Sequence, residues 1–392
     1  LGMTCPPSKI AGCFFMSSAL VLHAVIERFP IAGTFRIARG AKTEAIVVTV
    51  FADWIENGRR TARGRGEGVP YARYGETPES VMAEIERAAV ALETEADPRL
   101  ALQSLMARGA ARNALDCALW DLEAKRLGVP VWQLAGLAAP QPLTTAFTLS
   151  VDEPAAMEAA ARRSAHLPLL KIKLAGAGDE ARLRAVRRGA PEAGLIVDAN
   201  EGWTPALLGP LSALCAAAGV SFIEQPLPAA EDEALLGFES PVPLVADESV
   251  HDRGSLAGLV GKYRAVNLKL DKTGGLTEAL AVKQEAERLG FAIMVGCMVS
   301  TSLAMAPAVL LAQGAAVVDL DGPLLLAADR MPGLRYDGAR LEPAAAALRQ
   351  WPQGYSGWNG VSPRPSQVAS AEAVSPASIA AVRIAVIGRQ SM

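Results

Sequence analysis

The pattern of apolar and polar residues changes once along the chain. In residues 20–74, strand-like apolar runs alternate with polar and Gly-rich segments, of which 64–68 is typical of a turn. Helical patterns follow at 79–93 and 110–127, and the second ends in basic residues and a glycine, as a helix C-terminus should. We therefore predict a small antiparallel sheet with helices, an α+β domain over residues 16–140.

After a Pro-rich boundary at 139–142, strand and helix patterns alternate steadily. Short apolar runs closed by one charged residue recur every 22 to 26 positions. We predict eight strands in this region, at 145–150, 169–174, 195–200, 221–226, 243–249, 265–270, 292–298 and 317–321. A closed parallel barrel over residues 141–325 is favoured over an open sheet, because an open sheet seldom places charges at so many successive strand ends.

The two ends of the chain have a different character. Residues 10–26 are apolar but broken by two serines, and we interpret their second half as the first strand rather than as a signal peptide. Residues 1–15 are expected to be an extension without a structural role. Residues 326–350 are expected to return to the first domain, and 351–392 to form a poorly ordered tail with one short helix near 379–387.

Composition narrows the class of protein. The 392 residues are 51% apolar and 20% charged, with a net charge of −3, so a large core is expected and neither a nucleic-acid nor a membrane footprint is indicated. A small molecule is the expected partner. The five cysteines are scattered without a CxxC pair, which favours reduced thiols and a cytoplasmic location.

Three successive barrel strands are predicted to end in an acidic residue, namely Asp198, Glu224 and Asp247. One such residue alone would be an ordinary exposed acid. Three acids at neighbouring strand ends converge on one mouth of a barrel, and carboxylates without histidine or cysteine favour a hard divalent cation such as Mg²⁺. Such an ion could stabilise the enediolate formed when a proton is removed next to a substrate carboxylate.

Two lysines bracket these acids, because Lys173 closes the second predicted strand and Lys269 the sixth. Bases on opposite sides of one carbon permit racemisation or epimerisation, provided that a nearby dication and a second ammonium lower the lysine pKa. Lys171 shares the strand face of Lys173 and is expected to tune it. A purely structural role for these lysines is disfavoured, since lysine is costly inside so apolar a run.

Together these residues resemble a known family. The following motifs are similar to those of the enolase superfamily, muconate-lactonizing subgroup: Lys171-Ile172-Lys173, Asp198-Ala199-Asn200, Glu224-Gln225-Pro226, Ala246-Asp247-Glu248-Ser249 and Asn267-Leu268-Lys269. Segments 70–76, 110–121 and 296–298 are further similar to the bacterial L-Ala-D/L-Glu epimerases, over roughly residues 20 to 340. The resemblance implies a modified TIM barrel, (β/α)₇β, beneath an N-terminal α+β capping domain.

The resemblance also implies roles for individual residues. One Mg²⁺ per subunit would lie on Asp198, Glu224 and Asp247, with Lys173 and Lys269 as the two bases. Asn200 and Glu248 would contact the metal ligands without binding the ion themselves. Further substrate contacts are implied for Thr148, Lys171, Cys297 and Met298.

Two ends of a substrate remain to be bound. Asp319 and Asp321 match the Asp-x-Asp that holds the free ammonium of the substrate in dipeptide epimerases. Without this resemblance, a pair that caps a turn would be the favoured interpretation. The glutamate side chain needs a cation from the capping domain, and we assign Arg39. Other candidates are Arg36 and Lys42 in the same predicted loop, and Arg73 further along.

Two remaining features carry no predicted chemistry. The segment 272–275 contains Lys-Thr-Gly-Gly but lacks the spacing of a phosphate loop, and we interpret it as the turn after the sixth strand. The three histidines have no ligand spacing and are taken as structural or surface residues.

The leading hypothesis is a Mg²⁺-dependent dipeptide epimerase that inverts the Glu Cα of L-Ala-D/L-Glu, expected to be a homo-oligomer. The nearest alternative is an N-acyl-glutamate or N-acylamino acid racemase, which needs the same metal and bases but no ammonium site. Cycloisomerase or o-succinylbenzoate synthase activity is a weaker alternative on the same fold. A non-catalytic binding protein or a Schiff-base aldolase would not need three acids with two lysines.

Overall fold

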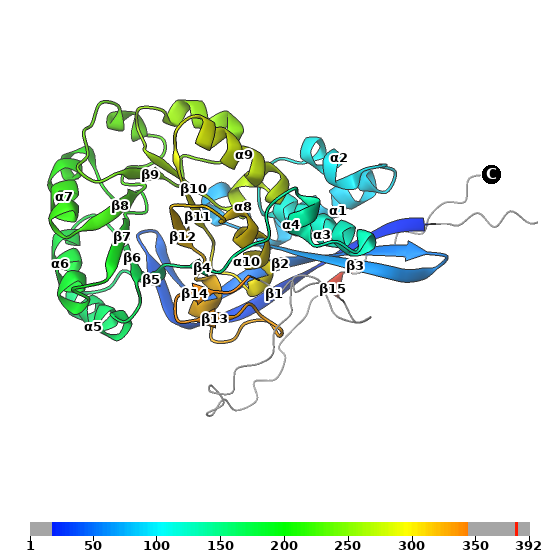
Figure 1. Cartoon of the computed structure of the whole chain (residues 1–392), viewed down its shortest axis with the longest axis horizontal. Helices are drawn as coiled ribbons and strands as arrows, with labels where there is room; N and C mark the ends of the chain where they lie inside the picture. Colours follow the sequence, from blue (N-terminus) through cyan, green and yellow to red (C-terminus); the bar gives the residue numbers. More distant parts are fainter. Residues whose placement is uncertain (1–17, 344–380, 383–392) are drawn as a thin grey trace, which may run out of the picture.

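The computed structural model describes residues 18–343 and 381–382. In Figure 1 they form a capping part on the right and a barrel on the left. The capping part contains an antiparallel sheet of β1 (Ser18–Ile37), β2 (Gly40–Glu56) and β3 (Arg59–Gly68). Its helices are η1 (Ala72–Tyr74), α1 (Pro78–Leu92), α2 (Pro98–Leu105), α3 (Ala110–Leu127) and α4 (Val131–Leu134).

The Gly-rich segment 64–68 is not the turn predicted from sequence. It is the second half of β3, and its alternate glycines all face α3. A Cβ on Gly66 would lie 2.1 Å from the carbonyl oxygen of Ala114, so any larger residue would push the helix away. The missing side chains let α3 rest directly on the sheet, which explains why this helix is buried almost throughout.

The predicted capping helices are present, and α2 is an addition to them. The first begins at Pro78, where Thr77 is the N-cap and exchanges hydrogen bonds with Ser80 in a capping box. The unpredicted α2 begins after Asp97, whose side chain accepts from the backbone N–H of Leu100 at 2.9 Å.

The barrel consists of eight parallel strands in sequential order. They are β5 (Phe147–Leu149), β6 (Leu169–Lys173), β7 (Gly194–Asp198), β8 (Val220–Glu224), β9 (Leu244–Ala246), β10 (Ala265–Leu268), β11 (Ala292–Gly296) and β12 (Val317–Asp319). The ring closes where Ala146 N donates to Val318 O at 2.8 Å. This confirms the predicted barrel.

The connections around the barrel are not uniform. They comprise α5 (Pro154–Ser164), α6 (Asp179–Gly189), α7 (Pro205–Ala217), η2 (Asp232–Leu235), η3 (Arg253–Leu259), α8 (Leu270–Thr273), α9 (Leu276–Arg288), α10 (Ser302–Leu311) and η4 (Gly322–Leu325). Only 3₁₀ turns follow β8 and β9, so the barrel is modified rather than regular. Among the described helices, none is long and apolar enough to cross a membrane.

The segment after the barrel returns to earlier parts of the chain. The short strands β13 (Tyr336–Asp337) and β14 (Arg340–Leu341) pair with β4 (Leu143–Thr144). Arg330 is mostly buried, and its Nη2 pairs with Glu27 at 2.6 Å and Glu67 at 2.8 Å, so it ties this segment to the capping sheet.

The predicted helix near 379–387 is wrong at the two positions that can be compared. Ala381–Val382 is a strand, β15, and it pairs antiparallel with β1. The remainder of that prediction, like residues 1–15 and 351–380, lies outside the described residues.

The segment predicted as a loop around Arg36 and Lys42 is a β-ribbon instead. The ribbon of β1 and β2 continues to the pair Ile37 and Gly40, with a bulge between Pro30 and Phe35. Figure 1 shows this blue ribbon passing from the capping helices across to the barrel. It contacts the barrel where Val151 N donates to Arg36 O at 3.1 Å. The ribbon therefore places its tip, residues 35–42, at the mouth of the barrel.

Candidate active site

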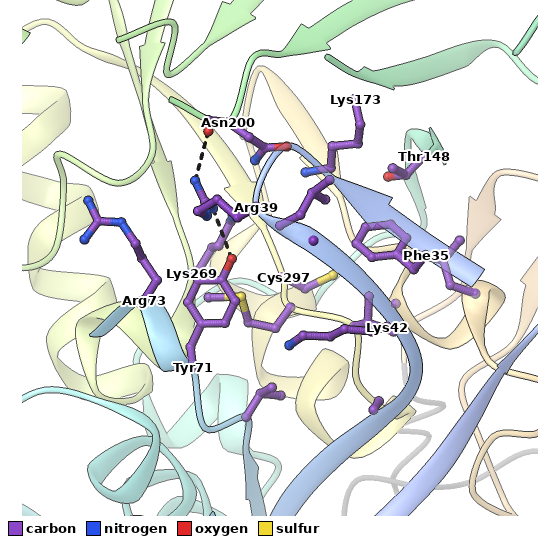
Figure 2. Close-up of a pocket in the computed structure, with 18 of the residues that line it drawn as sticks. Phe35, Arg39, Lys42, Tyr71, Arg73, Thr148, Lys173, Asn200, Lys269 and Cys297 are labelled. Carbon is purple, nitrogen blue, oxygen red and sulfur yellow. Dashed lines mark hydrogen bonds between the residues drawn. The ribbon is translucent and has the colours of Figure 1, made fainter. Parts of the chain in front are cut away.

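A cavity of about 430 Å³ lies between the ribbon tip and the carboxyl ends of the barrel strands. Figure 2 shows side chains from both parts pointing into it. Twelve of the fourteen residues predicted for the site line it: Arg39, Thr148, Lys171, Lys173, Asn200, Asp247, Glu248, Lys269, Cys297, Met298, Asp319 and Asp321. The barrel mouth and the capping domain thus form one pocket.

The other two predicted residues, Asp198 and Glu224, do not line the cavity and are fully buried. The register of the parallel strands explains why the acids meet. Asp198 on β7 stands level with Glu224 on β8, and also with Lys173 on β6. Each of Asp198, Glu224 and Asp247 offers an oxygen, and these oxygens lie within 4.8 Å of one another.

Each acid of this triad is ion-paired with a lysine. Lys173 Nζ lies 2.5 Å from Asp198 Oδ2, and Lys269 Nζ lies 2.6 Å from Asp247 Oδ2. Lys171 is buried, with Nζ 2.6 Å from Glu224 Oε2 and 3.2 Å from Asp198 Oδ2. These contacts bring the acids and the proposed bases into one charged cluster.

The pKa values of Lys269 and Lys171 are raised, whereas a base that acts near neutral pH needs a lowered pKa. Burial alone would lower the pKa of Lys269, but the carboxylates of Asp247 and Glu224 raise it well above its ordinary value. The pKa of Lys171 is likewise raised, against burial, chiefly by Asp319 and Glu224.

The chemistry of the donors fits a hard cation. The triad is made only of carboxylates, which are the ligands preferred by Mg²⁺ and Ca²⁺. Buried acceptor oxygens without a hydrogen-bond donor occur in the residues around it: Asn200 Oδ1, Glu248 Oε2, Asn267 Oδ1 and Asp319 Oδ1. A bound cation is one group that could satisfy buried acceptors of this kind.

The two acids predicted to hold an ammonium have different surroundings. Asp319 Oδ2 is 2.7 Å from Lys171 Nζ, so this carboxylate already has a cation. Asp321 Oδ2 accepts from the backbone N–H of Thr148 at 2.7 Å. Burial and the neighbouring Asp319 raise the pKa of Asp321 to about 7. Asp321 is therefore the acid of the pair that a substrate ammonium can reach without displacing a lysine.

The candidate cations of the capping part are also not equivalent. Arg36 is not among the residues that line the cavity, and it pairs with Asp152 at 3.1 Å on the surface. Arg39 and Arg73 both pair with Glu201. Among the described residues, no carboxylate lies within ion-pair distance of Lys42, which lines the cavity with its Nζ 5.3 Å from the centre of the Tyr71 ring.

Lys272, in the segment for which the sequence predicts no chemistry, contacts an acid of the triad. Its buried Nζ lies 2.5 Å from Asp247 Oδ1 and 2.5 Å from Asp247 O, and it donates to Asn267 O at 2.9 Å. It lies in α8, not in a plain turn after the strand. Its spacing of three residues from Lys269, one helical turn, was the only available signal.

Comparison with known proteins identifies the family of the chain. A family model described as enolase C-terminal domain-like matches residues 155–327, and one described as mandelate racemase / muconate lactonizing enzyme, N-terminal domain, matches residues 21–136. The chain is 45% identical over 317 residues to an L-Ala-D/L-Glu epimerase of Escherichia coli K12, covering 80% of this chain and 97% of that protein.

Two further similar proteins act on or bind a compound of glutamate. An N-acetyl-D-glutamate racemase of a Pseudoalteromonas species is 44% identical over 306 residues, covering 77% of this chain and 94% of that protein. A crystal structure from Agrobacterium tumefaciens, of an enolase family member with homology to dipeptide epimerases, has bound sodium and L-Ala-L-Glu. It shares 55% sequence identity with a TM-score of 0.79 and covers 83% of this chain and 98% of that one.

Proposed function

The chain belongs to the enolase superfamily, in its mandelate racemase and muconate lactonizing enzyme branch, and from this premise we propose that it epimerises the Glu Cα of L-Ala-D/L-Glu. One observation carries the proposal. Two lysines line a single cavity together with Asp247 of the buried acid triad. Asp321, just after β12, also lines it, and so does Lys42, which has no carboxylate at ion-pair distance among the described residues. The cavity thus offers sites for a carboxylate and for an ammonium.

The positions of the lysines support inversion at one carbon. Lys173 ends β6 and Lys269 follows β10, and these strands are four positions apart in a ring of eight, so they lie on opposite sides of the barrel. In the proposed reaction one lysine takes the Cα proton from one face, and the other returns a proton to the opposite face. Each lysine is ion-paired with a different acid of the triad, Lys173 with Asp198 and Lys269 with Asp247, and these pairs hold both ammonium groups at the barrel mouth.

We assign one Mg²⁺ per subunit to Asp198, Glu224 and Asp247, on the strength of their all-carboxylate donor set. Bound there, the ion would supply positive charge to the substrate carboxylate as the Cα proton leaves, and would offset the acid charge that raises the pKa of Lys269. Asn200 supports this set directly, because its backbone N–H donates to Asp198 Oδ1 at 2.9 Å.

For the substrate ends, we assign Asp321 to the ammonium and Lys42 to the side-chain carboxylate. Lys42 replaces Arg39 in this role, because Arg39 is already paired with Glu201 and Glu248. Thr148, Cys297 and Met298 are assigned to the walls of the cavity that they line. An N-acyl-glutamate racemase is the second candidate, favoured by the 44% identical Pseudoalteromonas relative.

The test is exchange of the Cα proton in D₂O, followed by NMR on purified enzyme with Mg²⁺. L-Ala-D-Glu, L-Ala-L-Leu and N-acetyl-D-Glu would be compared. We expect the acidic dipeptide to exchange and invert fastest, and Lys42→Met to remove its advantage over L-Ala-L-Leu. Arg36→Met is the matched control, a second cation of the same ribbon that does not line the cavity. Faster turnover of N-acetyl-D-Glu than of any dipeptide would replace the proposal with the racemase.

We further propose a cytoplasmic homo-oligomer. Cys117, Cys215 and Cys297 are free thiols, as a reducing compartment would leave them. Oligomeric state can be measured by sedimentation of the full chain.

A further inference from the structure

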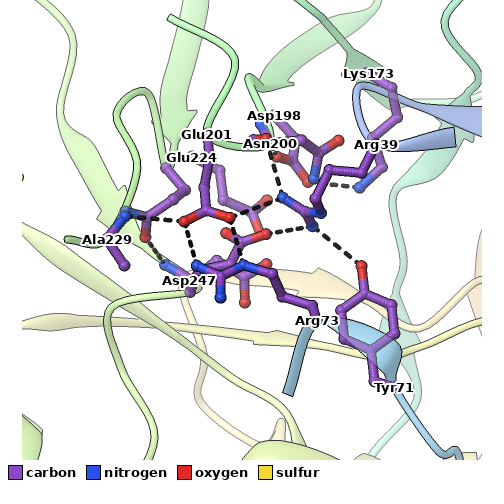
Figure 3. Close-up of polar contacts among 12 residues, drawn as sticks. Arg39, Tyr71, Arg73, Lys173, Asp198, Asn200, Glu201, Glu224, Ala229 and Asp247 are labelled. Atoms are coloured by element: carbon purple, nitrogen blue, oxygen red, sulfur yellow. Dashed lines mark hydrogen bonds and ion pairs between the residues drawn. The ribbon is translucent and has the colours of Figure 1, made fainter. Parts of the chain in front are cut away.

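Arg39, at the turn of the ribbon, contacts three separate segments of the chain. Its Nη1 donates to Asn200 O and to Glu201 Oε2, both at 3.0 Å. Its Nη2 donates to Tyr71 OH at 3.0 Å and to Glu248 Oε1 at 2.6 Å. Figure 3 shows the guanidinium at the centre of these contacts. Four of its five N–H groups are therefore used within the protein, and one remains.

Glu201 is the anchor for this arginine. Its side chain is only 8% exposed, and besides Arg39 it takes two hydrogen bonds from Arg73, each at 2.8 Å. The backbone N–H of Ala229 donates to it as well, at 2.9 Å. Glu201 has φ of +65°, a conformation that is costly for a residue other than glycine. The loop after β7 thus holds Glu201 in a strained backbone conformation, with hydrogen bonds to both oxygens of its carboxylate, next to the ribbon tip.

We propose that Arg39 and Glu201 are a positioning pair, which closes the ribbon tip onto the barrel and so holds Phe35 and Lys42 in the wall of the cavity. Arg39 does not bind the substrate. Arg39 contacts Asn200 and Glu248, which lie 161 and 209 positions further along the chain, in the barrel. These contacts therefore form only when the ribbon lies against the barrel. The expected effect of this pair on the turnover of acidic dipeptides rests on the proposed function, whereas the closure of the ribbon onto the barrel does not.

The ribbon offers a matched comparison in Arg36. That residue also pairs with a barrel carboxylate, Asp152, but the side chains are 49% and 44% exposed. The ribbon backbone at Arg36 is held independently, through Val151 N and Ser150 Oγ. Loss of the Arg36 side chain should therefore leave the tip closed.

The experiment measures two quantities on the full-length Mg²⁺-loaded enzyme: amide hydrogen exchange in residues 35–42, and KM and kcat for L-Ala-D-Glu. Arg39→Ala and Glu201→Gln should both speed exchange in that segment and raise KM about tenfold, with a smaller change in kcat. Arg39→Lys keeps the charge but cannot span Glu201 and Glu248, and should fall between wild type and Arg39→Ala. Arg36→Ala should match wild type in both readouts.

The alternative role gives a different pattern. If Arg39 binds the substrate carboxylate, Arg39→Ala raises KM while Glu201→Gln leaves KM unchanged or lowers it, and neither change speeds exchange. Unchanged exchange in Arg39→Ala overturns the proposal. An enzyme that fails to turn over L-Ala-D-Glu would refute the proposed function, while the exchange result would still decide whether the pair closes the ribbon.

Discussion

Asp321→Asn and Asp319→Asn should have different effects, although the two acids are only two residues apart. Asp319 is paired with Lys171 at 2.7 Å, whereas Asp321 takes one hydrogen bond from Thr148 and faces the cavity. Asp321→Asn should thus remove the ammonium partner of a dipeptide. A charge-assisted contact of this kind is worth about 1.5 to 3 kcal/mol, or roughly 10- to 150-fold in kcat/KM.

The assay is Cα proton exchange with L-Ala-D-Glu and with N-acetyl-D-Glu, which has no ammonium. Asp321→Asn should reduce kcat/KM for the dipeptide alone. Asp319→Asn should reduce it for both substrates, because Lys171 loses one of its three carboxylate partners. Equal losses on both substrates in Asp321→Asn would refute the assignment.

The same assignment predicts a pH dependence. Burial and Asp319 raise the pKa of Asp321 to about 7, and only the ionised carboxylate attracts an ammonium. Therefore kcat/KM for the dipeptide, divided by that for N-acetyl-D-Glu, should fall as pH drops below about 7. In Asp321→Asn this ratio should be low and independent of pH.

Three further results are expected. Lys173→Ala and Lys269→Ala should each abolish epimerisation while one epimer still exchanges deuterium through the remaining lysine, and full activity in either would contradict the two-base mechanism. Asp247→Asn should weaken Mg²⁺ binding in calorimetry, and activity that survives EDTA would argue against the metal. Burial raises the pKa of Asp271 to about 7, above the value in an unfolded chain, so this acid lowers stability increasingly as pH rises from about 4 to 7. Asp271→Asn should then raise the free energy of unfolding, measured in urea, by up to about 4 kcal/mol at pH 8.5 and by less at pH 5. A larger increase at pH 5 than at pH 8.5 would contradict a raised pKa of Asp271.

The barrel and its acids could be predicted because the relevant signals are local. Each strand is a short apolar run, and a charged residue closes it at a regular interval. Parallel strands carry their carboxyl ends to one mouth, so Asp198, Glu224 and Asp247 had to converge once the strands were recognised. The two lysines followed from the same argument.

Other features depend on how distant segments pack. Glycines in β3 resembled a turn because nothing local reveals that α3 lies against them. The ion pairs of Arg39 could not be predicted, because its partners, Glu201 and Glu248, lie more than 160 residues away in the sequence.

The sequence by itself thus determined the barrel, the acid triad and the lysine pair, since alternation and strand-end charges are properties of short segments. Only the tertiary structure decided which charges are already paired. Lys171 comes within reach of Asp319, and Glu201 within reach of Arg39, only when the barrel closes and the ribbon lies across it. Packing therefore also decides that Asp321 and Lys42 line the cavity without a partner of opposite charge among the described residues, and for this reason we propose them as the substrate contacts. Two charges attract strongly only at contact distance and away from water, and the folded arrangement alone provides both conditions.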